Sequence, residues 1–282
     1  MEKSVFQGLT IIKTTKPNVV VHSISSPIEG EMSNAQLIET KSKLLLIDAL
    51  QLKPHANSLK EYISSIGKPL DRVIVTHYHP DHWFGIASFK DYPIYALQEV
   101  IDRINALADF VLNYHRGIHG ENADAMIPSE KITPTLAIKE GTFQFDDIEF
   151  NLMKITDTEA PCILVPEIPE HKILFAQDLV YNGVHAYFGD KTTEGNFCFD
   201  NWINTIKDFQ NKNYELVFPG HGEPTDSTIF PTKIKYLEFA KKQIESGKQG
   251  ENLVNAITAE YPNYLLELTL VMSNYMLFEF KG

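Results

Sequence analysis

The 282-residue sequence has few cysteines, few basic residues and no long apolar run. Its two cysteines, Cys162 and Cys198, stand in no CxxC or other metal-type spacing, which excludes a disulfide scaffold and favours two reduced thiols. The 25 Lys and Arg residues are outnumbered by 37 Asp and Glu residues. The formal charge of -12 therefore excludes a global field that attracts nucleic acid or anionic membranes.

Two further absences bear on where the protein works. The N-terminus lacks the basic segment and long apolar run of a secretory signal. No later stretch approaches the roughly 18 uncharged apolar residues that a membrane span needs. We therefore expect a cytoplasmic protein that has neither nucleic-acid nor membrane partners.

What the sequence does contain is apolar material in short runs separated by turn residues. Hydrophobic residues make up 43% of the chain, which is enough to bury a large core. No repeat or Pro/Gly/Ser-rich linker stands out, so we expect a single domain over residues 1–282. Strands are predicted over residues 18–24, 43–49, 72–77, 93–97, 143–155, 162–166, 172–176 and 215–221. The run around Asp146–Asp147 indicates a hairpin.

Helical patterns lie between the predicted strands. They cover residues 51–66, 98–116 and 200–211, and most of the chain from Pro231 onward. The sequence thus predicts an α/β/α layered fold with a helical insertion over about residues 98–140 and a helical tail over about residues 231–282. The tail is rich in Leu, Tyr and Met, and we interpret it as a packed terminal helix or as the surface of a homodimer.

One short stretch concentrates metal-binding residue types. The segment THYHPDH, residues 76–82, contains three of the ten histidines and one aspartate. It directly follows a predicted strand, and Pro80 favours a turn that brings the residues on either side together. Imidazole and carboxylate are ligands that zinc, manganese and iron accept. The segment therefore predicts a metal site at the edge of a sheet.

With this motif, the sequence resembles the metallo-β-lactamase-fold hydrolases, whose signature is H-x-H-x-D-H. Three other segments fit the resemblance: KLLLIDA with Asp48, HKILFAQDLV with Asp178, and VFPGHG with His221. Their order and spacing agree over roughly residues 15–225. The resemblance implies an αββα sandwich with the site at one edge.

The resemblance also implies the ligands. It places two divalent ions at the site, with zinc expected first and manganese or iron as alternatives. It assigns His77 and His79 to the first metal, Asp81, His82 and His221 to the second, and Asp178 as the bridge. Asp81 would in addition orient or deprotonate the nucleophile.

The pattern breaks at one position. Relatives usually supply a third first-site histidine from a segment such as G-H-T-x-G, whereas this chain has KITDTEAPCILVP, with Asp157 where the histidine would stand. Three interpretations stay open. Asp157 is a carboxylate ligand, which is our leading prediction; Glu159 reaches the metal instead; or the first site is incomplete and only one metal binds tightly.

The implied activity is hydrolysis, because a metal lowers the pKa of bound water from about 15.7 towards roughly 7. We expect a small-molecule substrate: an ester, lactone, thioester or amide. Two alternatives remain. One is a single-iron oxidoreductase of the same fold, such as a sulfur dioxygenase, and the other is a binding or regulatory protein with a degraded metal site. No Gly-x-Ser-x-Gly segment supports serine chemistry.

Three histidines outside the motif have open roles. His115 and His119 lie in the predicted insertion, near Arg116, and this group is a candidate for substrate contact. His185 follows Asp178 by seven residues, and it is either an exposed loop residue or a residue that supports the site or contacts substrate.

Overall fold

The computed structural model describes residues 1–192 and 194–280. The chain divides into two compact units, and we describe each by itself. Unit 1 comprises Met1–Lys154 and Ile163–His171, and unit 2 comprises Ile155–Cys162 and Lys172–Gly282. The expectation of one domain over residues 1–282 stays a prediction beside this division.

Unit 1 is built on a sheet of eight strands that follow one another in chain order. The strands are β1 (Glu2–Phe6), β2 (Leu9–Lys16), β3 (Val19–Ser25), β4 (Asn34–Glu39), β5 (Leu44–Ile47), β6 (Leu70–Ile74), β7 (Ile94–Ala96) and β8 (Leu136–Ala137). Pairing is antiparallel from β1 to β5 and parallel from β5 to β8. The sequence of β5 is uniformly apolar and every residue in it is buried, as is typical of a strand covered on both faces.

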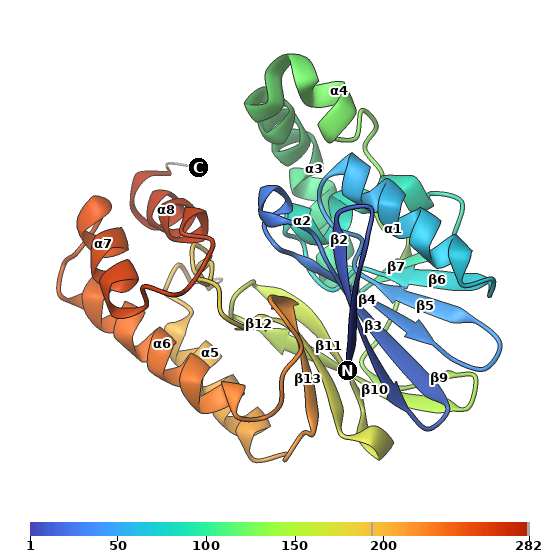
Figure 1. Ribbon diagram of the computed structural model, residues 1–282. Helices are drawn as coiled ribbons and strands as arrows, with labels where there is room; N and C mark the ends of the chain where they lie inside the picture. Colours follow the sequence, from blue (N-terminus) through green and yellow to red (C-terminus); the bar gives the residue numbers. More distant parts are fainter. Residues whose placement is uncertain (193, 281–282) are drawn as a thin grey trace. The chain divides into compact units, whose positions relative to one another are not determined.

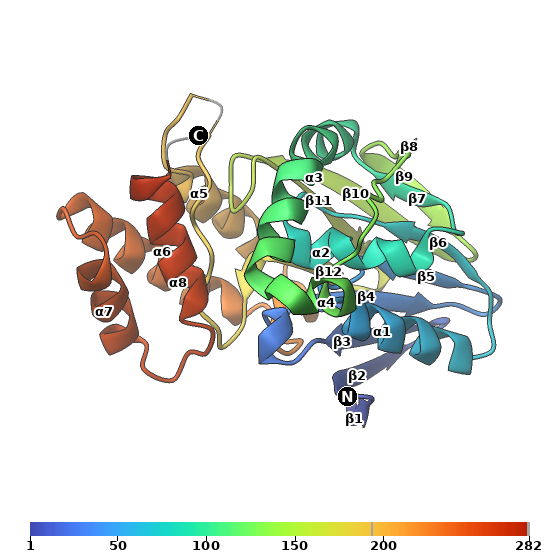
Figure 2. The ribbon, with the colours of Figure 1, turned by 90° about the horizontal axis from the view of Figure 1, so that it is seen from above.

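Helices cover one face of this sheet, as Figures 1 and 2 show. They are α1 (Lys53–Ser65), α2 (Pro80–Trp83), α3 (Gln98–His119) and α4 (Ala123–Met126), with 3-10 turns at Ile28–Gly30, Phe84–Phe89 and Gly120–Asn122. A further 3-10 turn of unit 1 lies at Pro169–His171. On α3 the buried residues recur at three- and four-residue steps, namely Val100, Ile101, Ile104, Ala108 and Leu112. The expected insertion over about residues 98–140 is therefore helical at first and ends in β8.

Unit 1 also contains the predicted hairpin. Strands β9 (Gly141–Phe145) and β10 (Ile148–Thr156) are antiparallel and turn at Asp146, whose φ is 51°. The Asp146 carboxylate accepts hydrogen bonds from Thr40 and Ser42, which tie the hairpin to the first sheet. β11 (Cys162–Ile168) follows, and the Leu164 amide donates to the Thr76 carbonyl at 2.9 Å.

Unit 2 combines two parallel strands with most of the remaining helices. Strands β12 (Ile173–Tyr181) and β13 (Leu216–His221) pair side by side, and all nine residues of β12 are buried. The helices are α5 (Phe199–Gln210), α6 (Ile229–Glu245), α7 (Glu251–Glu260) and α8 (Leu268–Asn274), continued by a π-helical turn at Tyr275–Glu279. Helix α5 packs on α6, and the Trp202 indole donates to the Leu179 carbonyl at 3.0 Å, so these helices cover the strands (Figure 1). The predicted helical tail is thus confirmed.

Four strands were not predicted from the sequence. β1 is almost wholly exposed, β2 contains two lysines, β4 carries Asn, Gln and Glu, and β8 has only two residues. These compositions hide the alternation or the apolar run by which a strand is recognised, and the strands form because a neighbouring strand pairs with them.

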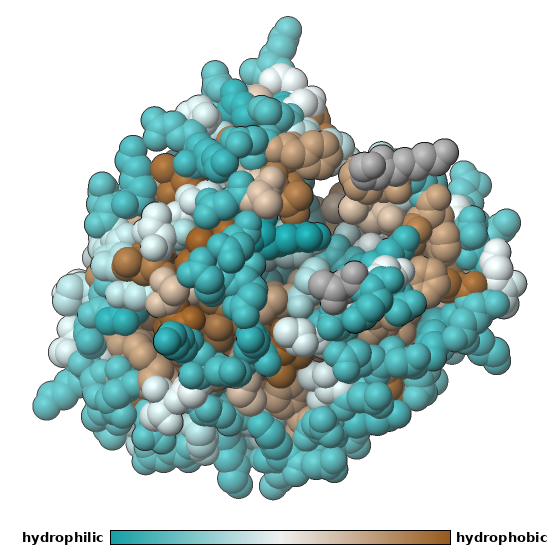
Figure 3. Space-filling model, turned by 180° about the vertical axis from the view of Figure 1, so that it is seen from behind, coloured by the Kyte–Doolittle hydropathy of each residue, from teal (hydrophilic) through white to brown (hydrophobic). Residues whose placement is uncertain are grey.

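The surface is mainly polar. Figure 3 shows one face on which hydrophilic residues predominate and hydrophobic residues are scattered. Exposed large apolar side chains form two helical series, Phe110, Tyr114 and Ile118 on α3, and Leu268, Val271 and Tyr275 on α8 and the turn that continues it. Among the described residues, no helix is both long enough and apolar enough to cross a membrane.

Candidate metal centre

The THYHPDH segment lies at the end of β6 in unit 1. His77 lies in a bend, His79 has an extended backbone, and Pro80 begins α2, so that Asp81 and His82 occupy its first turn. This confirms the turn that the sequence predicted at Pro80. The His77 and His79 rings are 4.9 Å apart between centroids, and each offers a ligand atom within 4.8 Å of the other's. His82 Nε2 lies 3.1 Å from Asp81 Oδ2.

Asp48 holds this segment from behind. Its carboxylate is fully buried and accepts hydrogen bonds from the Thr76 amide at 2.8 Å and the Thr76 hydroxyl at 2.7 Å. A further contact, 2.9 Å, joins Asp48 Oδ2 to His82 Nδ1, so the ring presents Nε2 towards Asp81. Burial raises the pKa of the Asp48 carboxyl, while His82 and Thr76 act to lower it. Asp48 therefore orients His82, as carboxylates commonly orient histidines that bind metal.

In unit 2, an irregularity in β12 presents Asp178. The register between β12 and β13 shifts on both sides of Gln177, whose φ of 48° lies in the left-handed region. Such a bulge turns the next side chain to a new direction. Asp178 is 1% exposed, and its Oδ2 lies 3.3 Å from Nε2 of His221 at the end of β13. Two of the predicted ligands of unit 2, Asp178 and His221, therefore meet near the carboxyl ends of two parallel strands.

Gly220 leaves the space that Asp178 occupies. A Cβ atom at position 220 would lie 1.7 Å from Asp178 Oδ1, far inside van der Waals contact. Glycine is thus required next to His221 by the carboxylate itself and not by the backbone angles. The Pro-Gly-His sequence at the end of β13 therefore leaves room for the buried carboxylate of Asp178.

The break in the pattern falls in a tight turn. Asp157 has a φ of 53°, its amide donates to Pro161 O at 3.1 Å, and its side chain is half-buried. Glu159 is 1% exposed, and its ligand atom lies within 4.8 Å of that of Asp178. Among the described residues, Asp157 joins no cluster of metal-ligand type. Asp157 as a ligand stays a prediction, and the geometry within unit 2 favours Glu159.

Tyr181 connects the residues of this cluster. Its hydroxyl donates to Asp178 Oδ2 at 2.7 Å and to Glu159 Oε1 at 3.2 Å. Its ring stacks on His221 with centroids 4.7 Å apart and an interplanar angle of 4°. From the sequence, Tyr181 was expected at most as a polar wall of the site and not as a residue that holds the carboxylates; its position three residues after Asp178 at the end of β12 was the available signal.

The other histidines have different environments. His115 packs against the Phe84 ring, 5.3 Å between centroids, and burial lowers the pKa of His115 to about 4, although Asp81 acts to raise it. Helix α3 therefore lies close to the motif within unit 1. His185 is 1% exposed and its Nδ1 is 3.2 Å from the Tyr236 hydroxyl. It is not an exposed loop residue, as one of our two interpretations had it, but part of the core of unit 2.

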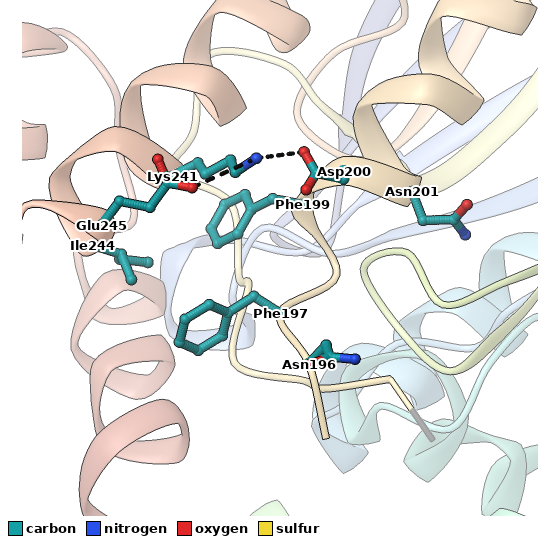
Figure 4. Close-up of a pocket in the computed structure, with 8 residues that line it drawn as sticks. All are labelled: Asn196, Phe197, Phe199, Asp200, Asn201, Lys241, Ile244 and Glu245. Carbon is teal, nitrogen blue, oxygen red and sulfur yellow. Dashed lines mark hydrogen bonds and ion pairs between the residues drawn. The ribbon is translucent and has the colours of Figure 1, made fainter. Parts of the chain in front are cut away.

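A separate pocket lies between α5 and α6 in unit 2. Its volume is about 480 Å³, and Figure 4 shows the residues that line it, which are Asn196, Phe197, Phe199, Asp200, Asn201, Lys241, Ile244 and Glu245. Lys241 lies 2.5 Å from Asp200 and 3.6 Å from Glu245, so its charge is balanced (Figure 4). No lining residue is a predicted ligand. This pocket is distinct from the candidate metal-binding residues.

The residues of both clusters fit a divalent metal. Each unit holds buried imidazole and carboxylate groups whose ligand atoms lie within 4.8 Å of one another, namely Asp48, His77 and His82 in unit 1, Glu159 with Asp178 in unit 2, and Asp178 with His221 in unit 2. Nitrogen and oxygen donors of this kind suit zinc, manganese and iron. The space at Gly220 is a second observation, independent of the donor atoms, because it allows the Asp178 carboxylate to be buried. A carboxylate buried at this depth requires a compensating positive charge.

A comparison with curated proteins finds a relative of this chain. Alkyl/aryl-sulfatase BDS1 of Saccharomyces cerevisiae (strain ATCC 204508 / S288c) is 26% identical over 247 residues, which are 76% of this chain and 37% of that protein. This chain therefore spans little more than a third of the length of that relative.

Solved structures agree on the fold. DIM-1 metallo-beta-lactamase exposed to ceftazidime superposes with a TM-score of 0.60 at 20% identity, covering 84% of this chain and 100% of that one. TMB-1 gives a TM-score of 0.60 at 21% identity, covering 83% and 99%. A metallo-beta-lactamase from Pontibacter korlensis gives 0.58 at 17% identity, covering 84% and 98%. The expected metallo-β-lactamase fold is confirmed.

The family comparison covers both units. The profile of the metallo-beta-lactamase superfamily matches residues 28–221, a span that begins before β4 and ends at His221. It contains every predicted ligand. The chain therefore belongs to the metallo-beta-lactamase superfamily of metal-dependent hydrolases.

Proposed function

We propose that the chain hydrolyses a small ester with two divalent metal ions, zinc first among them, held by the residues of both units. His77, His79 and Glu159 would bind the first ion, Asp81, His82 and His221 the second, and Asp178 would bridge them. The observation that carries the proposal is that each unit brings residues of metal-ligand type close together, most of them buried, within the span that the superfamily profile matches.

The choice of Glu159 over Asp157 follows from unit 2 alone. Glu159 shares the Tyr181 hydroxyl with Asp178, whereas the turn leaves Asp157 half-buried. A carboxylate is acceptable to these metals in place of a histidine. Glu159 therefore fills the position that the missing histidine leaves, two residues further along the chain.

The chain's own residues then have separate tasks. Asp48 fixes the ring of His82, and Tyr181 fixes both carboxylates of unit 2. Asp81 would accept a proton from the attacking water or orient it. A bound divalent cation supplies the acidity of that water and polarises the ester.

The substrate class follows from the curated relative. Because that relative is an alkyl/aryl-sulfatase by name, we place alkyl and aryl sulfate esters first, followed by carboxylic esters and lactones, with thioesters, amides and β-lactams after them. The fold itself selects none of these, since one fold hosts many activities.

The test is a panel of aryl sulfate, aryl acetate, lactone and cephalosporin substrates with metal-loaded protein. We expect turnover of the sulfate ester above the others, abolished by chelation and by His79→Ala. Asp109→Asn, which changes an exposed ion pair on α3, is the matched surface control and keeps full turnover. Silence of the metal-loaded protein across the whole panel would overturn the proposal.

A further inference from the structure

Unit 2 contains a concentration of buried negative charge. Glu159 and Asp178 are each 1% exposed, and their ligand atoms lie within 4.8 Å of one another. Two buried carboxylates so close cost several kcal/mol in the absence of positive charge. Where the superfamily pattern has a neutral histidine, this chain therefore adds an anion that needs compensation.

A buried lysine lies in the same cluster. Lys233 comes from the first turns of α6 and is 3% exposed. Its Nζ stands 4.5 Å from the centroid of the Tyr181 ring and 4.7 Å from that of Tyr236, with Trp202 at 5.4 Å. Aromatic faces attract a desolvated cation, and three of them around one ammonium make a site that holds it in place.

The charges that act on Lys233 are the two carboxylates. Burial lowers the pKa of Lys233 to about 7, and the Asp178 and Glu159 carboxylates act in the opposite direction. Tyr181 provides the geometric link, because its ring lies under the ammonium while its hydroxyl donates to both carboxylates. Lysine, tyrosine and the two acids therefore form one buried assembly.

We propose that Lys233 is a built-in counter-charge for Glu159, so that the Glu159–Lys233 pair has the same net charge as the neutral histidine it replaces. The proposal rests on the proposed function, in which Glu159 is a metal ligand. One added anion and one added cation leave the charge of the loaded site unchanged, and the site keeps its attraction for an anionic ester. Lys233 is in this sense a positioning residue, since it acts through Tyr181 and the carboxylates.

A double-mutant cycle tests the pairing. The variants are Lys233→Met, Glu159→Gln and the two combined, each nearly isosteric, and the measurement is the urea midpoint of chelated and of metal-loaded protein. Lys233→Met leaves two buried carboxylates without their cation, and Glu159→Gln leaves Lys233 with Asp178 alone. We therefore expect a loss of stability in each single variant and a clearly smaller loss in the double variant than the sum. Additive losses in both forms of the protein would overturn the proposal.

A second cycle uses the metal as the readout. Glu159→His restores the usual ligand type but leaves Lys233 as an excess cation, so we expect metal affinity to rise at least about tenfold when Lys233→Met is added to Glu159→His. Lys233→Arg keeps the charge and should keep wild-type affinity in the Glu159 background. Equal affinity of Glu159→His with and without Lys233→Met contradicts the proposal.

Two controls separate the possible failures. Lys241→Met removes a lysine from the same helix whose partners are Asp200 and Glu245, and it should be additive with Glu159→Gln. If wild-type protein binds no divalent ion, the proposed function fails. The coupling between Lys233→Met and Glu159→Gln in chelated protein still tests whether Lys233 compensates the charge of Glu159. If Lys233→Met does not fold, the cycle is repeated with Lys233→Gln.

Discussion

The candidate ligands of unit 1 and those of unit 2 differ in chemistry and in origin. In unit 1, His77, His79, Asp81 and His82 come from one stretch of six residues, and three of the four are imidazoles. In unit 2, Glu159, Asp178 and His221 come from a turn and two strand ends, and two of the three are carboxylates. A local motif can be supported by one residue such as Asp48, whereas a dispersed set needs the bulge, the space at Gly220 and the shared tyrosine.

Removal of the Asp178 side chain should have the largest effect on activity, because it deletes a central ligand of unit 2. Asp178→Ala deletes the carboxylate that both ions would share, so we expect hydrolysis to fall by more than about 100-fold, beyond the loss for a residue that only orients a ligand. Metal content per chain should fall with it. Full metal content and full activity would show that unit 2 supplies no bridging ligand, and Asp109→Asn serves as the surface control.

The next effect distinguishes the two acids of the turn. Glu159→Ala should lose roughly half of the bound metal, because a ligand of one ion is removed, while Asp157→Ala should lose little. Metal stoichiometry of the purified variants is the measurement. The opposite ranking would return the ligand role to Asp157, and an unchanged stoichiometry in both would leave the first ion without a carboxylate from this turn.

A smaller effect is expected from the residue behind the unit 1 motif. Asp48→Asn keeps the shape of the side chain but weakens its hold on His82, and the loss in activity or metal affinity should be about 10- to 100-fold. Titration with a competing chelator measures the affinity. A loss as large as that of Asp178→Ala would mean that Asp48 does more than orient a ring.

The last prediction concerns pH, and it compares two buried histidines, one from each unit. Burial lowers the pKa of His185 in unit 2 to about 4, so the unfolded chain, with a pKa of ~6.5, takes up the proton first as pH falls. The free energy of unfolding should therefore fall by up to about 3 kcal/mol because of His185 as pH decreases from 6.5 to 4, and His185 should have no such effect above pH 6.5. His22 in unit 1 should cost less, because Glu39 favours its charged form.

Urea unfolding at pH 7 and pH 5 measures this difference. His185→Gln keeps a polar partner for Tyr236 and removes the titration, so its stability should fall less on acidification than that of the wild type. An equal fall in both proteins would assign the acid sensitivity to other groups.

The sequence was sufficient to predict the candidate ligands of unit 1 and the longer helices and strands. The motif could be found from its residue types and its place after an apolar strand, whereas Asp178 and His221 were indicated by the resemblance to the family. Glu159 could not be chosen over Asp157, since the choice depends on the left-handed backbone of Asp157, which no residue pattern specifies. Lys233 escaped notice because a lysine on an amphipathic helix ordinarily faces water. The exposed strand β1 and the polar strand β4 are defined by their pairing partners.

The glycine at position 220 has a consequence for how new activities can arise on this chain. Every single-step replacement of Gly220 would put a side chain where Asp178 now lies, so this position is closed to gradual adaptation while the carboxylate remains. Gly117 on α3, by contrast, has open space around its Cβ position. A side chain can therefore be added at position 117 without displacing a neighbour, whereas position 220 can change only together with Asp178.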